Sequence, residues 1–161
     1  MTIGVALPTV LEPLGWLVGD WAGDGRGEYP TIADFTYREE TSFHFVGKPY
    51  LAYTQRTWLA SDGSPSHMES GYLRPGASGL AELVIAQPTG VVEVLVGTVT
   101  GARVQFEATS LAATPTAKSV TGVRRFFERR GDELWYSLEM AAVGEAMAFH
   151  CEATLHPVPS M

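Results

Sequence analysis

From Trp21 onward the chain alternates short runs of β-branched and aromatic residues with clusters of turn residues, at a short and fairly regular spacing. Runs of this kind are typical of strands joined by tight connections. The breaks include SDGS (61–64), PGASG (75–79) and PTG (88–90), in which glycine, proline and short polar residues favour turns. The pattern predicts roughly ten strands, which from residue 49 onward cover 49–60, 66–74, 80–87, 91–101, 102–112, 119–130, 132–142 and 149–156.

A single early segment has a helical pattern. Its apolar residues recur at three- and four-residue steps after Pro8-Thr9, which is a suitable helix start. These residues are Val10, Leu11, Leu14, Leu17 and Val18. A long succession of strands must stack as two sheets or close on itself, and closure removes the exposed edges that promote aggregation. We therefore predict an all-β fold: a closed antiparallel β-barrel of about ten strands with a short N-terminal helix, enclosing an apolar ligand cavity.

Charge and composition limit the classes of partner. The 161 residues include no stretch that resembles an interdomain linker, and 45% of them are hydrophobic, so we expect one domain over residues 1–161. The net charge of −7 repels nucleic acid and anionic membrane surfaces. We expect neither of them as a partner.

Three features of the sequence bear on the cellular compartment: its apolar runs, its N-terminus and its cysteine content. No apolar run reaches the ~18 residues of a membrane-spanning helix, and the N-terminus lacks the basic start and apolar core of a signal peptide. Cys151 is the only cysteine, which excludes an intrachain disulfide and a cysteine-based zinc site and agrees with a reducing compartment. We expect a cytoplasmic protein.

The stretch GDWAGDGRGEYPTI (19–32) is rich in glycine. A phosphate-binding glycine loop lies between a strand and a helix, but no helical pattern follows Gly27. Glycines inside a strand mark bends, bulges or places where other groups pack closely. We therefore interpret these glycines as clearance around Trp21, which plugs one end of the barrel over the helix.

The same stretch carries a family signature. Gly19, Trp21, Gly23 and Gly25 form a Gly-x-Trp-x-Gly-x-Gly motif, and Tyr29-Pro30-Thr31 follows it. With these motifs the chain resembles the nitrobindins, heme-binding β-barrels related in shape to fatty-acid-binding proteins. The resemblance extends roughly over residues 10 to 156, with further matching segments in the same order: GKPYLAYTQRTW (47–58), HMESGYLRP (67–75), LVIAQPTGVVEVLVG (83–97) and YSLEMAA (136–142).

The resemblance implies a ten-stranded barrel that holds heme b in an apolar pocket, with the propionate edge near the mouth. The family's proximal iron ligand, in a His-(Leu)-x-Ala-x-Leu pattern, corresponds to His150 in FHCEATLH (149–156). The chain departs from the pattern at Cys151, where an aliphatic residue is usual, and His156 is an alternative ligand. Cys151 itself is interpreted as a small buried hydrophobe.

Strand periodicity by itself opposes the assignment of His150. Strict alternation places His150 with Glu152 and Thr154, opposite the apolar Cys151 and Ala153, and so outside the barrel. His150 faces inward only if an irregular residue after VGEAMA (143–148) shifts the register of the strand. The heme assignment therefore predicts a bulge near His150.

Four further positions match family residues that touch heme or line its cavity. Thr31 lies where a hydroxyl can donate a hydrogen bond to a propionate. The alternative interpretation is that Thr31 is an exposed strand residue without a ligand. The alternative for Met140 is that it only fills the core, and the alternative for His67 is that it is a surface residue near a turn. Gln87 shares a face with Leu83 and Ile85 by alternation. His44 has no matched role and is expected on the surface.

The implied function is that of a ferric heme b protein, with His150 as the catalytic iron ligand, which binds nitric oxide and isomerises peroxynitrite to nitrate. The expected partners are these small molecules, and a second copy of the chain is a further candidate. Two alternatives use the same barrel without iron: a carrier of a fatty acid or other small hydrophobic ligand, and an interaction module.

Overall fold

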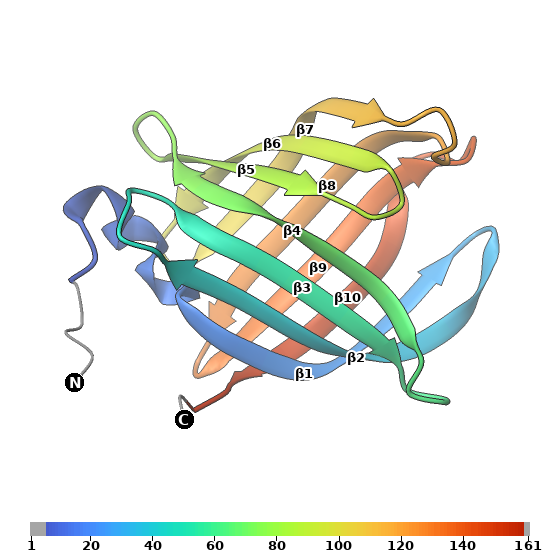
Figure 1. Ribbon diagram of the computed structural model, residues 1–161, viewed down its shortest axis with the longest axis horizontal. Helices are drawn as coiled ribbons and strands as arrows, with labels where there is room; N and C mark the ends of the chain where they lie inside the picture. The colour runs from blue at the N-terminus through green and yellow to red at the C-terminus, as the bar shows by residue number, and fades with distance from the viewer. Residues whose placement is uncertain (1–5, 160–161) are drawn as a thin grey trace.

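The computed structural model describes residues 6–159, and ten strands within them form one closed antiparallel barrel in the order β1-β10-β9-β8-β7-β6-β5-β4-β3-β2 (Figure 1). The predicted fold class is confirmed, and the strand bounds agree with the predicted ones to within a few residues. The strands are β1 Gly19–Tyr29, β2 Ile32–Phe45, β3 Leu51–Leu59, β4 Pro65–Pro75, β5 Leu80–Ala86, β6 Val91–Thr100, β7 Arg103–Ala113, β8 Val120–Arg130, β9 Glu133–Ala142 and β10 Ala148–Pro157.

The predicted helix is a 3₁₀-helix, η1, over Thr9–Leu17. Pro13 lies inside it and has no N–H to donate, which weakens a regular α-helical ladder. Three leucines of the predicted pattern are buried: Leu11, Leu14 and Leu17. No helix within residues 6–159 is long and apolar enough to span a membrane.

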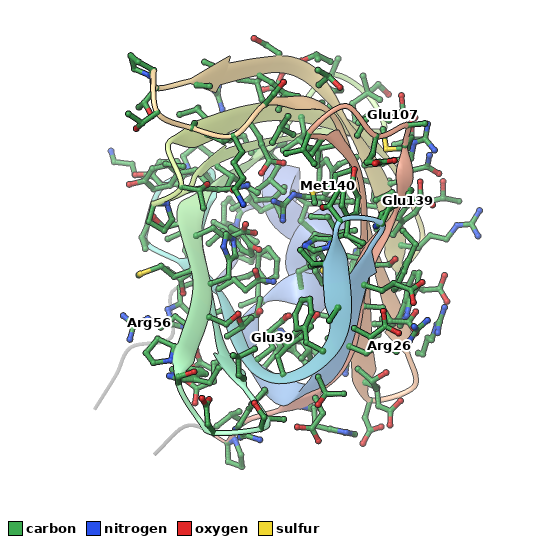
Figure 2. The ribbon with its side chains drawn as sticks, turned by 90° about the vertical axis from the view of Figure 1, so that its right-hand side faces the viewer. Arg26, Glu39, Arg56, Glu107, Glu139 and Met140 are labelled. Atoms are coloured by element: carbon green, nitrogen blue, oxygen red, sulfur yellow. The ribbon has the colours of Figure 1, made fainter. Side chains whose placement is uncertain are left out.

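The two ends of the barrel differ. η1 lies at one end, and the hairpins β1-β2, β3-β4, β5-β6, β7-β8 and β9-β10 turn at the other (Figure 1). Figure 2 looks into this second end, with η1 behind. In that view Glu39 lies inside the ring of strands, whereas Arg56 and Glu107 project outside. We call the end formed by these five turns the mouth.

The glycines of β1 provide clearance, as we predicted, but for the backbone of β10 and for aromatic rings of β2 rather than for Trp21. A Cβ atom at Gly23 would lie 2.1 Å from the Thr154 carbonyl oxygen of β10, and one at Gly25 would lie 2.4 Å from the Tyr37 ring. Trp21 is buried and donates a hydrogen bond from Nε1 to the Leu17 carbonyl oxygen at 2.9 Å. The motif therefore attaches the barrel wall to η1, and the chain continues as a strand with no phosphate-binding helix after Gly27.

We predict that Gly23→Val destabilises the ligand-free protein by about 1–3 kcal/mol, because its side chain overlaps backbone of the neighbouring strand. The measurement is urea unfolding. Asp24→Val, at an exposed position of the same strand, is the matched control and should change stability little. A Gly23→Val protein of normal stability that has lost ligand binding would show that the glycines serve the ligand.

Candidate functional site

A cavity of about 690 Å³ opens at the mouth of the barrel. This volume lies in the range of roughly 300–1,000 Å³ usual for small-molecule sites. Part of its wall is apolar: Phe35, Leu59, Val91, Val123 and Leu138. All five residues predicted from the sequence to bind the cofactor also line it: Thr31, His67, Gln87, Met140 and His150.

The predicted bulge is present at His150. In the ladder between β10 and β9, Phe149 pairs with Glu139 and Cys151 pairs with Leu138, so His150 is an extra residue without a partner on β9. Because the extra residue shifts the side-chain alternation, both His150 and Cys151 line the cavity. The conflict between strand periodicity and the family pattern is thereby resolved.

The ring of His150 is held in one tautomer. Its Nδ1 lies 3.1 Å from the carbonyl oxygen of Glu28, just beyond the last ladder pair of β1 and β10, Gly27 with Cys151. A carbonyl only accepts hydrogen bonds, so Nδ1 carries the proton and Nε2 keeps its lone pair. Burial lowers the pKa of His150, which outweighs the opposite effect of the Glu28 bond. His150 is thus a neutral imidazole with a free nitrogen, the form that binds a metal.

Aromatic side chains fix the orientation of this imidazole. The Tyr29 ring packs edge-on against His150, with centroids 5.5 Å apart, and the Phe35 ring lies 6.2 Å away. The Tyr29 hydroxyl accepts from the Ala142 N–H at 2.9 Å and donates to the Met140 carbonyl oxygen at 3.1 Å. Tyr29 therefore ties β1 to β9 on either side of the bulged strand.

The other histidines differ in placement. His156, the alternative iron ligand, is exposed on the outside of β10, with Nδ1 3.8 Å from Glu133. His44 is exposed as expected and bonds to Asp20 at 2.8 Å. Cys151 lies beside His150 and is half-buried, and desolvation raises the pKa of its thiol to about 12, which disfavours the reactive thiolate.

The remaining predicted residues occupy two levels of the cavity. Thr31 is exposed in the turn between β1 and β2, at the mouth, and Met140 is half-buried near the end of β9. His67 and Gln87 are half-buried and each bonds to a buried carboxylate. The His67 Nε2 lies 3.1 Å from Glu69 Oε2, and the Gln87 amide donates to Glu93 Oε2.

A buried charge network forms the deeper part of the cavity, and the sequence analysis missed it. Arg125 is fully buried between Glu69 and Glu93. Its five N–H groups make bonds of 2.6–3.1 Å to these two carboxylates and to the Tyr136 hydroxyl. Five is the full donor capacity of a guanidinium, so Arg125 has none left for a ligand.

Glu39 belongs to the same region but is not paired with Arg125. It is 1% exposed and lines the cavity; Oε2 accepts from the Thr41 hydroxyl at 2.8 Å. Oε1 is buried without a hydrogen-bond partner. Burial raises the pKa of Glu39 to about 7. A neutral carboxylic acid explains how one oxygen remains unpaired, because an isolated buried carboxylate is strongly unfavourable.

The arrangement suits heme. A neutral imidazole with its Nε2 free lies in a cavity whose wall is partly apolar, and these are features that a protein supplies to heme iron. The fit rests on the chemistry of His150 and on its fixed tautomer. Within residues 6–159 no cluster of three or more His, Cys, Asp or Glu side chains could hold a bare metal ion.

The sequence and the fold both have close relatives. The chain is 48% identical over 158 residues to peroxynitrite isomerase 1 of Mycolicibacterium paratuberculosis, covering 93% of this chain and 98% of that protein. It is also 48% identical over 157 residues to peroxynitrite isomerase 1 of Mycobacterium tuberculosis, covering 93% and 96%. The crystal structure of Rv2717c from M. tuberculosis superposes with a TM-score of 0.88 at 46% identity, covering 96% of this chain and all of that one.

A model of the THAP4-like, heme-binding beta-barrel domain matches residues 10–156, which is nearly the whole chain. The match includes the glycine-rich strand, the cavity and His150. The chain therefore belongs to the THAP4-like family of heme-binding β-barrels.

Proposed function

We propose that this protein binds heme b through Nε2 of His150 and isomerises peroxynitrite to nitrate. The observation that carries the proposal is the bulge in β10, which presents a neutral imidazole of fixed tautomer to the cavity. The names of relatives that are 48% identical over nearly their whole length support the reaction.

The chain's own residues have distinct parts in this function. Nε2 of His150 would hold the heme iron, and the Glu28 carbonyl keeps the proton on Nδ1. The aromatic rings of Tyr29 and Phe35 limit the rotation of the imidazole. The apolar wall excludes water from one part of the cavity. When bound, ferric heme supplies the metal chemistry that converts peroxynitrite to nitrate.

Nitric oxide is a further small ligand in this proposal, since heme iron held by one protein nitrogen would be able to bind it. Thr31, His67, Gln87 and Met140 are proposed to contact heme because they line the same cavity as His150. The formation of a homodimer stays a prediction.

The charge network disfavours one form of the carrier alternative, a fatty acid bound with its head group at depth. A fatty acid that entered head first would bring its carboxylate to Glu69, Glu93 and Glu39, and Arg125 has no free donor to receive it. An unpaired carboxylate at this depth is strongly unfavourable. The interior therefore does not offer an anionic lipid head a partner.

The test is peroxynitrite decay with hemin-loaded protein. We expect the loaded protein to speed the decay and to raise the nitrate yield while nitration of added tyrosine falls. The physical reason is that the cavity walls would shield a bound ligand from water, whereas free hemin in solution offers no such shielding.

The controls are ligand-free protein, the His150→Ala protein and equimolar free hemin, all at one pH because protonated peroxynitrite decays by itself. Loaded protein that is no faster than ligand-free protein contradicts the isomerase function. The same holds for faster decay with increased tyrosine nitration.

A further inference from the structure

One acidic side chain in the deeper part of the cavity has an unused oxygen. Glu39 of β2 lines the cavity, is 1% exposed and lies inside the ring of strands (Figure 2). Its Oε2 accepts a hydrogen bond from the Thr41 hydroxyl at 2.8 Å, but within residues 6–159 its Oε1 has no hydrogen-bond partner. The Gln55 amide is close enough to lower the pKa of Glu39, yet it makes no hydrogen bond to Oε1. A ligand that donates to Oε1 would supply the missing partner.

The other two carboxylates at this depth are already occupied. Each oxygen of Glu69 and of Glu93 accepts at least one hydrogen bond, and Arg125 donates to both side chains. Arg125 in turn has no N–H left for an anion, because all five of its donors are bonded within the protein. Among these three carboxyl groups, Oε1 of Glu39 is therefore the oxygen that is free for a ligand.

The balance of charge at this depth favours a cation. With Glu39 ionised, three carboxylates share the single guanidinium of Arg125, and all four groups line the cavity. A positive ligand group is attracted by the excess of negative charge, whereas an anion is repelled and finds no donor. Within residues 6–159 no group of three or more His, Cys, Asp or Glu side chains could hold a metal ion. The cation that fits is therefore a nitrogen group with N–H donors.

The wall between this depth and the mouth is partly apolar. Phe35 precedes Glu39 on β2, and Val123 precedes Arg125 on β8, so both apolar side chains lie nearer the turns of the mouth. Leu138 of β9 lines the cavity as well. Burial of an alkyl chain against such side chains is favourable, by roughly 0.8 kcal/mol for each methylene group. The cavity therefore suits a nitrogen cation that is attached to an aliphatic chain.

We propose that the deep end of the cavity is a binding site for an alkylammonium group, with the ammonium bonded to Oε1 of Glu39 and the aliphatic chain directed along the apolar wall toward the mouth. The ligand class is a primary amine in its protonated form. The site uses no atom of His150, and the inference does not depend on the proposed heme function.

Binding at this site is coupled to the release of a proton. Burial raises the pKa of Glu39 to about 7, so the carboxyl group is mostly protonated at pH 6 and mostly ionised at pH 8. An alkylammonium, like a lysine side chain, keeps its charge at both pH values. Because the cation binds the ionised carboxylate, its affinity should rise roughly tenfold from pH 6 to pH 8 and level off above that.

The neighbours of Glu39 do not account for a pH dependence in this range. On the adjacent strands Glu39 pairs with Gly23 and Thr57, which carry no charge. The groups that interact with it electrostatically have pKa values shifted away from neutral pH: Tyr37 on β2, Glu69 on β4, Arg125 on β8, Tyr136 on β9 and Cys151 on β10. His67 bonds to Glu69 rather than to Glu39.

The experiment titrates the full-length, hemin-free protein with n-octylammonium, 1-octanol and octanoate at pH 8, followed by isothermal titration calorimetry. The three probes share one chain length and differ in the charge of the head group. We expect wild type to bind octylammonium at least roughly tenfold more tightly than 1-octanol, and octanoate more weakly than either. Glu39→Gln should weaken octylammonium binding roughly 10- to 100-fold and leave 1-octanol binding unchanged within about two-fold, which also shows that the variant is folded.

The matched control is Glu40→Gln, which removes the same charge from the next residue, exposed on the outside of the same strand, and should bind octylammonium as wild type does. At pH 6 octylammonium affinity should fall roughly tenfold in wild type and stay constant in Glu39→Gln. His67 is present in both proteins and cannot cause such a difference. The proposal is overturned if octylammonium binds no more tightly than 1-octanol, if Glu39→Gln binds it as wild type does, or if wild-type affinity is equal at the two pH values.

Discussion

His150→Gly is expected to lose normal ferric heme ligation while the barrel stays folded. Of the two candidate iron ligands, His150 and His156, His150 is the one that lines the cavity, and its bulge has no partner on β9 that the substitution would disturb. Loss of an outer-shell partner of a metal ligand costs roughly 10- to 100-fold in affinity, and loss of the ligand itself should cost more. The measurement is a hemin titration followed by the Soret band, with thermal unfolding of the ligand-free protein alongside.

The matched control for this prediction is His156→Gly, which removes an exposed imidazole from the outside of the same strand and should leave hemin binding unchanged. Added free imidazole should restore the Soret band of His150→Gly, because the substitution leaves room for it beside Glu28. An unchanged spectrum and affinity in His150→Gly would instead assign the iron to another residue.

Glu39→Gln is expected to stabilise the ligand-free protein at pH 8 by about 3 kcal/mol and to leave its stability at pH 4.5 nearly unchanged. Burial raises the pKa of Glu39 from 4.5 to about 7, so the folded state binds more protons than the unfolded state between these values. The wild-type protein therefore loses stability as the pH rises through this window, and the loss is complete above pH 7. Glutamine has no charge to desolvate, so the variant avoids the loss.

The control for Glu39 is Glu69→Gln, whose effect should have the opposite sign. Burial opposes ionisation of Glu69, but the Arg125 guanidinium outweighs it and holds the pKa well below the usual range. Its contribution is present above the unfolded pKa and is lost as the pH falls, so Glu69→Gln should destabilise at pH 8, by about 3–5 kcal/mol. Urea unfolding at both pH values measures each variant. Parallel pH dependences for wild type and Glu39→Gln would contradict the raised pKa.

Strand alternation by itself assigns two charged residues to the interior of the barrel, where their charge would not lead us to expect them. Arg125 lies between Val123 and Phe127, and Glu93 lies between Val91 and Leu95, at alternating positions that all face inward. Alternation therefore indicates the inner face for both residues. A charge is normally expected outside, because the cost of burying it is recovered only by partners on other strands. Those partners, far apart in the chain, are invisible to periodicity.

The sequence by itself determined the barrel, its short helix and the structural role of the glycines near Trp21, because turn residues, alternation and the family motifs are local signals. Only the tertiary structure decided how His150 reaches the cavity. Its inward position depends on an extra residue relative to β9, and its tautomer depends on a backbone carbonyl 122 residues away. The charge network also depends on the tertiary structure, since a buried guanidinium is stable only where the closed barrel brings Glu69 and Glu93 around it.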